Sequence, residues 1–233
     1  MVRSASYGPH PARDSVGLTI PYLRGVPASA RHLLLVRHGQ SEWNAIGRWQ
    51  GHADPPLSAL GEEQAREAAT RLDGVGFSAV MSSDLRRARR TAEILAAALG
   101  LPVAVDPELR EIDVGDWQGL TRAEIEAGWP GELAAWSEGR SESPPGGETR
   151  AHLAERARRA LVRAAAGAQP GDRLLVVAHG ALVRHLDRLL GLEPHPVDNL
   201  GGRWYESDGN GSLVPGATVS LADPDDRTLS PST

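Results

Sequence analysis

The chain has 233 residues, of which 40% are hydrophobic and 24% are charged, and its formal net charge is -5. These proportions are typical of one globular domain, and the acidic balance argues against nucleic acid or a membrane surface as a partner. Cysteine is absent, which excludes disulfides, a thiolate nucleophile and cysteine-ligated zinc. The apolar runs are too short to cross a bilayer and the first residues lack a secretion signal, so a cytoplasmic location is expected.

Apolar and polar segments alternate along the chain. Residues 1–30 and 223–233 lack periodicity and are expected to be flexible, which leaves 31–222 as the folded domain. Continuous apolar strands alternating with helices predict an α/β fold, a three-layer α/β/α sandwich around a mostly parallel sheet. In chain order the expected elements are a strand at 32–36, a helix at 58–72, a strand at 79–82, a helix at 84–99, a strand at 102–105, helices at 121–127 and 148–167, a strand at 174–178 and a helix at 181–190.

Local signals support several of these boundaries. Thr121 and Glu124 have the spacing of a capping box at the start of a helix, and Gly100 has the position of a helix C-terminus. The segment 143–148 contains two prolines followed by two glycines, so we expect an irregular loop beside the site.

Two of the predicted strands end in a histidine followed by a glycine. His38 follows the strand at 32–36, and His179 follows the strand at 174–178. Ligands of parallel sheets gather beyond the carboxyl ends of the strands, so both histidines are expected to face one pocket. A single histidine at such a position is more often structural, but a pair that lies beside Arg37 favours catalysis.

A neutral imidazole at His38 can act as a nucleophile toward phosphorus. Arg37 can supply a bidentate fork to phosphoryl oxygens, and Ser41 and Asn44 can add neutral donors. A second arginine is expected from the four that lie between 86 and 90, at the start of a helix. Helical spacing spreads these four around the axis, so most of them must be solvated, and spacing alone does not select one.

A carboxylic acid is needed to protonate the leaving alkoxide. Glu111, Asp113 and Asp116 lie close together in the sequence and are equally suitable by position. A surface salt bridge is the alternative explanation for each of them.

The segment from Arg37 to Asn44 resembles the signature of the histidine phosphatase superfamily, which includes the cofactor-dependent phosphoglycerate mutases. Three further segments resemble the other motifs of that family in the same order. The matching segments are Ser83-Asp84-Leu85-x-Arg87-Ala88-x-x-Thr91-Ala92, Leu109-x-Glu111 and Ala178-His179-Gly180.

The resemblance implies a phosphoglycerate mutase-like fold and an enzyme that needs no metal or other cofactor. It implies that His38 accepts the phosphoryl group, that Glu111 donates and accepts the proton, and that Arg87 is the second arginine of the site. Arg37, Arg87 and His179 then form the phosphate pocket. Gln50 and Gly51 resemble the segment that follows the signature. The substrate-binding residues implied by the resemblance are Arg37, Ser41, Asn44, Gln50, Gly51, Arg87 and Gly180.

The short stretch between Glu111 and His179 is similar to the phosphatase branch of the family and shorter than in the mutases. We therefore expect hydrolysis of a small phosphorylated metabolite, a phosphoglycerate or sugar-phosphate derivative, with a mutase as the alternative. The segment 194–206 is where we expect differences in specificity. The sequence leaves open whether the protein forms a homodimer.

Two other classes of function, a metal-dependent hydrolase and a phosphate-binding module, are alternatives for the same residues. His38, His179 and Glu111 could form a metal-dependent hydrolase site, but two arginines in one pocket repel a divalent cation. A noncatalytic phosphate-binding module would keep the arginines without needing His38 or Glu111, and both residues are present.

Overall fold

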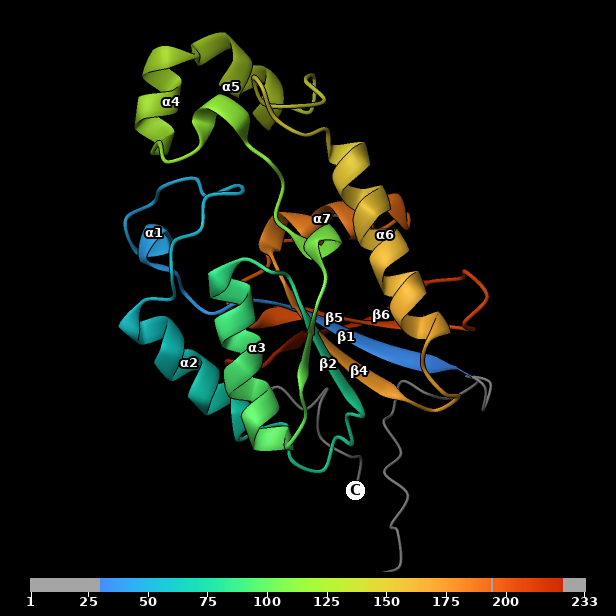
Figure 1. The fold of residues 1–233 in the computed structure, drawn as a ribbon. Helices are drawn as coiled ribbons and strands as arrows, with labels where there is room; N and C mark the ends of the chain where they lie inside the picture. Colours follow the sequence, from blue (N-terminus) through green and yellow to red (C-terminus); the bar gives the residue numbers. More distant parts are fainter. Residues whose placement is uncertain (1–29, 194, 224–233) are drawn as a thin grey trace, which may run out of the picture.

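A computed structural model describes residues 30–193 and 195–223, and a six-stranded sheet forms its centre (Figure 1). Strands β3, β2, β4 and β1 are parallel, whereas β5 and β6 each run antiparallel to the preceding strand in the sheet. The expected mostly parallel sheet is confirmed. The strands are β1 (Arg31–Arg37), β2 (Ala79–Ser82), β3 (Val103–Val105), β4 (Arg173–Ala178), β5 (Gly201–Ser207) and β6 (Val214–Ser220), in the order β3-β2-β4-β1-β5-β6.

The two antiparallel strands were not predicted, because their sequences lack a continuous apolar run. β5 begins with Gly201 and Gly202, and β6 contains Pro215 and Gly216. Gly202 is required by a close approach between strands, since a Cβ atom there would collide with the carbonyl oxygen of Leu35 on β1. The glycines and the proline of β5 and β6 weaken the strand pattern in the sequence, but the sheet accommodates them.

The predicted helices are present in the structure, with differences at their ends. The helix predicted at 58–72 ends at Ala69, and the one predicted at 84–99 begins at Arg86. The capping box of Thr121 and Glu124 and the left-handed Gly100 (φ 67°) are confirmed. The helices are α1 (Glu42–Ala45), α2 (Ala59–Ala69), α3 (Arg86–Leu99), α4 (Arg122–Gly128), α5 (Pro130–Ser137), α6 (Arg150–Ala166) and α7 (Gly180–Leu189), with 3-10 turns at Pro107–Leu109 and Gly115–Trp117.

Helices α1 and α5 were not predicted. Both are short, and α5 starts at Pro130 immediately after α4, which breaks the periodic pattern over this region. Figure 1 places α4 and α5 away from the sheet, on the side toward which the carboxyl ends of the parallel strands point. The segment 143–148, which lies between α5 and α6, is irregular as expected.

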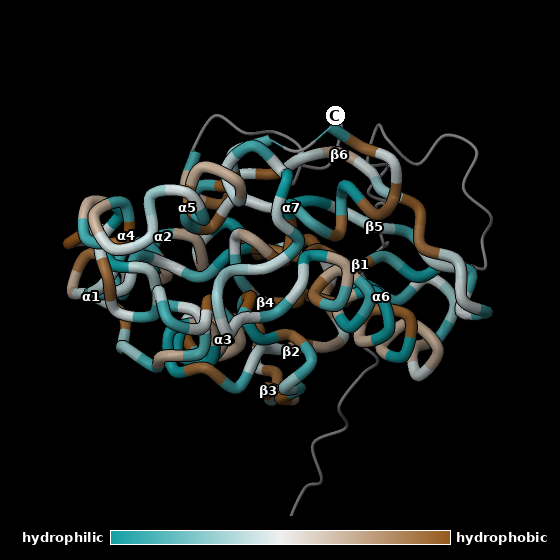
Figure 2. The backbone as a smooth tube through the Cα atoms, turned by 90° about the horizontal axis from the view of Figure 1, so that it is seen from above, coloured by the Kyte–Doolittle hydropathy of each residue, from teal (hydrophilic) through white to brown (hydrophobic). Residues whose placement is uncertain are grey.

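Alternate residues of β1 face two separate cores. Leu33 and Leu35 belong to the cluster that includes residues of α6 and α7, whereas Leu34 and Val36 belong to the cluster that includes residues of α2 and α3. Helices therefore cover both faces of the sheet, which confirms the three-layer sandwich. Figure 2 shows the hydrophobic stretches gathered around β1, β2 and β4, between helices of mixed polarity.

The sequence also predicted flexible chain ends and no membrane-spanning helix. Residues 1–29 and 224–233, which make up nearly all of the predicted extension and tail, lie outside the described residues. In the part that is described, no helix has the length and apolar character needed to span a bilayer.

Candidate active site

The two histidines at the strand ends lie beside each other beyond the sheet. β1 and β4 are parallel neighbours in which Arg37 pairs with Ala178, so His38 and His179 leave the sheet at the same level. The His38 backbone N–H donates to the Ala178 carbonyl at 3.0 Å. The two imidazole rings have their centroids 5.1 Å apart and their planes at 67°. The structure therefore brings together the pair that the sequence placed far apart in the chain.

His38 has a defined tautomer and a free ring nitrogen. Its side chain is buried, and Nδ1 lies 2.6 Å from the Gly39 carbonyl oxygen. A carbonyl can only accept, so Nδ1 carries the proton and Nε2 keeps a lone pair. Burial, followed by the charges of Arg87 and Arg37, holds the pKa of His38 well below its usual range. His38 is thus a neutral imidazole, the state that a nucleophile needs.

The two predicted arginines flank His38. Arg87 is 1% exposed, and it donates to the carbonyls of Ala53 at 2.7 Å and Gly51 at 2.9 Å, while its Nε has no partner among the described residues. Burial lowers the pKa of Arg87 to about 10, so it stays positive at neutral pH. Arg37 donates to the Val197 carbonyl at 2.8 Å and also lines the cavity.

Of the four arginines near the start of α3, Arg87 is the one that lines the active-site cavity within the described ranges. Arg89 pairs with Glu93 at 3.0 Å, and Arg90 pairs with Glu62 at 3.0 Å, all on the surface. Helical spacing separates these side chains as expected, because residues at different angles around the axis face different surroundings.

His179 is fully buried and has two unused ring nitrogens. Neither Nδ1 nor Nε2 has a hydrogen-bond partner in the described part of the chain. Burial first, then the charges of Arg87 and other neighbours, lowers the pKa of His179 well below its usual range. A neutral imidazole can donate from one nitrogen, and a buried donor without a partner is costly unless a ligand oxygen accepts from it.

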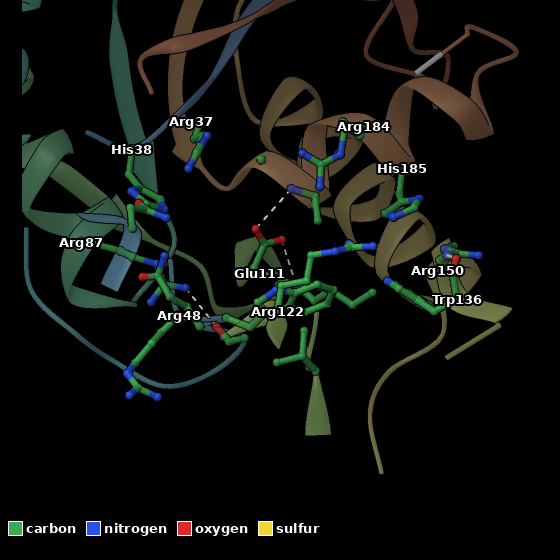
Figure 3. A pocket seen from close by; sticks show the side chains of 18 of the residues that line it. Arg37, His38, Arg48, Arg87, Glu111, Arg122, Trp136, Arg150, Arg184 and His185 are labelled. Atoms are coloured by element: carbon green, nitrogen blue, oxygen red, sulfur yellow. Dashed lines mark hydrogen bonds between the residues drawn. The ribbon is translucent and has the colours of Figure 1, made fainter. Parts of the chain in front are cut away.

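Glu111 is the carboxylate that reaches the cavity. Two backbone N–H groups orient it, from Ile112 at 2.9 Å and from Ala181 at 3.2 Å (Figure 3). Its negative charge raises the pKa values of Arg37 and Arg87 against the opposing effect of burial. The other two carboxylates that sequence spacing left open do not line the cavity, so geometry distinguishes Glu111 from them.

The remaining predicted substrate-binding residues divide into two groups. Asn44, Gln50, Gly51 and Gly180 line the cavity. Ser41 does not, because its buried hydroxyl donates to the Gln50 side-chain oxygen at 2.8 Å and accepts from the Asn44 backbone N–H at 3.1 Å. Ser41 is thus in a position to orient Gln50 and to cap α1.

Arg156, which the sequence did not indicate, supports the backbone of Glu111. Arg156 of α6 is 6% exposed and donates to the backbone carbonyls of Glu108, Arg110 and Glu111 at 2.6–2.8 Å. The same guanidinium pairs with both carboxylate oxygens of Glu148, each at 2.8 Å. The unremarkable helical spacing of Arg156 carried no signal of this role.

The outer part of the cavity was also not predicted from the sequence. The cavity has a volume of about 520 Å³, within the range of small-molecule sites, and it extends well past His38. Side chains of α4, α5, α6 and α7 contribute to its lining, and Figure 3 shows several of them. These outer residues include Arg48, Arg122, Trp136, Arg150, Arg184, His185 and Arg188.

The alternative metal site formed by His38, His179 and Glu111 has no support in the geometry. Within residues 30–193 and 195–223, no group of three or more histidine, aspartate or glutamate side chains is arranged to hold a metal ion.

A neutral histidine between two arginines, at the carboxyl edge of a parallel sheet and opposite a carboxylate, is a site suited to phosphoryl transfer. Comparison with known proteins agrees with this arrangement. Residues 33–205 match the histidine phosphatase superfamily (branch 1), and the chain belongs to this superfamily of enzymes.

Three similar proteins illustrate the range within the family. The glucosyl-3-phosphoglycerate phosphatase of Mycolicibacterium vanbaalenii is 43% identical, over 84% of this chain and 88% of its own length. The probable phosphoglycerate mutase GpmB of Escherichia fergusonii is 43% identical, over 68% of this chain and 74% of its own. The structure of a mycobacterial glucosyl-3-phosphoglycerate phosphatase in complex with VO3 is 36% identical, with a TM-score of 0.69, over 82% of this chain and 99% of that one.

Proposed function

We propose that this protein hydrolyses a small phosphorylated metabolite through a phosphohistidine on His38, without a metal. One observation carries the proposal: the Nε2 lone pair of a neutral, buried His38 lies among Arg37, Arg87 and His179, and three buried nitrogen atoms of Arg87 and His179 have no partner among the described residues. Phosphoryl oxygens are suitable acceptors for such donors, because they are anionic and can accept several hydrogen bonds at once.

The proposed reaction has two steps. In the first, Nε2 of His38 attacks phosphorus, the bond from phosphorus to the ester oxygen breaks, and protonated Glu111 gives its proton to the leaving alkoxide. In the second, water attacks the phosphohistidine, Glu111 takes a proton from that water, and Nε2 leaves with its lone pair restored. Arg37, Arg87 and His179 stabilise the charge on the transferring group in both steps.

The proposed substrate class is a phosphorylated glycerate or sugar derivative. Two relatives named for action on glucosyl-3-phosphoglycerate support this class, as does a cavity much larger than a phosphate group needs. Asn44, Gln50, Gly51 and Gly180 are proposed to contact the substrate. A cytoplasmic location belongs to the same proposal, because phosphorylated metabolites are too polar to cross a bilayer unaided. The acidic net charge supports the absence of a nucleic-acid or membrane partner.

A phosphoglycerate mutase is the second candidate, and the similarity to the probable mutase of Escherichia fergusonii favours it. Both activities use the same phosphohistidine and differ in whether water or a second substrate hydroxyl accepts the phosphoryl group.

The test is phosphate release from glucosyl-3-phosphoglycerate, 3-phosphoglycerate, sugar phosphates and nucleotides, with a chelator present. Isomerisation of 3-phosphoglycerate is followed in parallel, and His38→Ala serves as the inactive control. Preferred, chelator-insensitive hydrolysis of one compound supports the proposal. Isomerisation that depends on 2,3-bisphosphoglycerate, with little net phosphate release, would make the mutase the correct assignment.

A further inference from the structure

The outer part of the cavity is strongly basic. Beyond Arg37 and Arg87 it is lined by five more arginines, and within the described residues Glu111 is the one acidic side chain of the lining. The chain as a whole carries a net charge of -5, so this concentration of positive charge is local. We call this part of the cavity the outer chamber. The arginines that line it are Arg48, Arg122, Arg150, Arg184 and Arg188.

Two of the five arginines are engaged by the protein itself. Arg48 donates to the Gly119 carbonyl and pairs with Glu124 at 3.1 Å. Arg150 donates to the carbonyls of Ser141 and Trp136, and its guanidinium carbon lies 3.6 Å from the Trp136 ring centroid. These contacts fix both side chains as part of the chamber wall.

The other three arginines lack any such contact. Within residues 30–193 and 195–223, the side chains of Arg122, Arg184 and Arg188 make no hydrogen bond and no ion pair. Several other exposed arginines are paired, as Arg158 is with Glu155 and Arg163 is with Asp106. Arg122, Arg184 and Arg188 thus line one cavity without a protein partner among the described residues.

The positive charges of the outer arginines act on neighbouring titratable groups. Burial first, and then the charges of Arg184, Arg150 and Arg188, lowers the pKa of His185 to about 4. Arg184 likewise lowers the pKa of Arg37. Positive charge thus continues from the end of the cavity at His38 outward along α7. Like charges held together without a counter-ion oppose folding, and natural proteins retain such arrangements mainly at functional sites.

The three unpaired arginines come from two separate helices, α7 and α4. Gly180, Arg184 and Arg188 are spaced four residues apart on α7, so they lie along one face that leads away from the phosphate end. Arg122 is the first residue of α4, whose start is fixed by the capping box of Thr121 and Glu124. Figure 3 shows Arg122 and Arg184 extending into the pocket from these different elements, with His185 beyond them.

We propose that Arg122, Arg184 and Arg188 bind a second anionic group of the substrate, a carboxylate or a second phosphate, while the first phosphate lies at His38. Guanidinium groups bind both anions through paired hydrogen bonds. This inference rests on the proposed function and specifies it: the favoured substrate is a phosphomonoester with a second negative charge. His185, neutral and with a buried Nδ1 that lacks a partner among the described residues, is placed to add a neutral hydrogen bond to the same ligand.

The test compares ligands that differ in the second anion alone. 3-Phosphoglycerate and glycerol 3-phosphate differ by a carboxylate in place of a hydroxymethyl group; fructose 1,6-bisphosphate and fructose 6-phosphate differ by one phosphate. Each ligand is titrated calorimetrically into the full-length His38→Ala protein, which binds without turnover. Turnover of the same four compounds by the unsubstituted protein is measured separately.

We expect the member with two anionic groups to bind more tightly by about tenfold or more in at least one pair, since charged hydrogen bonds are strong. Arg122→Gln or Arg188→Gln should remove most of that preference. Arg89→Gln, on the surface of α3 and paired with Glu93, is the matched control and should keep it.

Equal affinity within both pairs would overturn the inference, as would a preference that survives both substitutions. A loss of preference in Arg89→Gln as well would show that general charge, and not the outer chamber, is responsible, and would also overturn it. Failure of the unsubstituted protein to hydrolyse any ester would instead refute the proposed function, while the binding result still decides the subsite.

Discussion

Replacing Arg156 with methionine should destabilise the protein strongly and also impair catalysis. Arg156 and Glu148 form an ion pair in which both side chains are 8% exposed. Methionine has a helix propensity similar to that of arginine and is close to it in length, so α6 itself should tolerate the change. What is lost is the set of hydrogen bonds to Glu148 and to the backbone around Glu111.

The magnitude follows from what remains buried after the change. The Glu148 carboxylate loses its bidentate partner, and the carbonyls of Glu108 and Arg110 lose a charged donor. Removing one member of a buried ion pair costs about 3–5 kcal/mol. The hydrogen bond to the Glu111 carbonyl is lost too, and a displacement of about 1 Å at the reacting groups can lower kcat/KM by about 10²-fold.

Arg158→Met is the matched control. It lies two residues along the same helix and also pairs with a glutamate, Glu155, but the two side chains are 35% and 41% exposed. An exposed pair of this kind contributes about 0–1 kcal/mol. Urea unfolding followed by tryptophan fluorescence should therefore shift its midpoint by about 1–2 M for Arg156→Met, and by much less for Arg158→Met.

The effect of Arg156→Met should also depend on pH. Burial alone would raise the pKa of Glu148, but the hydrogen bonds and charge of Arg156, together with the Asp113 backbone N–H and the charge of His152, outweigh it, and the net pKa lies below the ordinary value of 4.5. A carboxylate with a depressed pKa stabilises the folded state above its unfolded pKa, and this contribution is lost as pH falls through the folded pKa. The difference in stability between the parent and Arg156→Met should thus shrink below pH 4.5. Equal destabilisation by Arg156→Met and Arg158→Met at neutral pH would refute this reasoning.

Three further predictions concern the reacting groups. Glu111→Gln should slow hydrolysis of alkyl esters much more than of p-nitrophenyl phosphate, because the alkoxide needs a proton; equal losses in steady-state kinetics would exclude the acid role. His38, whose pKa is held well below 6.5 mainly by burial, should still be neutral at pH 6.5, where a free imidazole is half protonated, and an imidazole 15N NMR titration with a midpoint near 6.5 would contradict this. Arg87→Lys keeps the charge but cannot serve the Ala53 and Gly51 carbonyls and a phosphoryl group together, so kcat/KM should fall by about 10²-fold; a loss of less than about threefold would refute it.

The sequence predicted the layers of the fold because their signals are local. The apolar runs of β1 and β4 identify strands that are covered on both faces, and the alternation with helices implies the parallel sheet. β5 and β6 escaped prediction because their glycines and proline weaken the strand pattern, and what makes them strands is pairing with β1 and with each other. Pairing of this kind is a property of the neighbours, which a local pattern does not contain.

Part of the site was likewise predictable from the sequence, and part was not. The sequence by itself placed His38 and His179 at the carboxyl ends of two strands, and the resemblance to the family's motifs singled out Arg87 and Glu111. The tertiary structure decided that Ser41 supports Gln50 instead of lining the cavity, that Arg156 holds the backbone of Glu111, and that arginines of α4 and α7 meet in one chamber. The physical reason is that the apolar strands and the motifs that follow them are encoded over short distances, whereas the electrostatics of the cavity arise where helices distant in sequence converge.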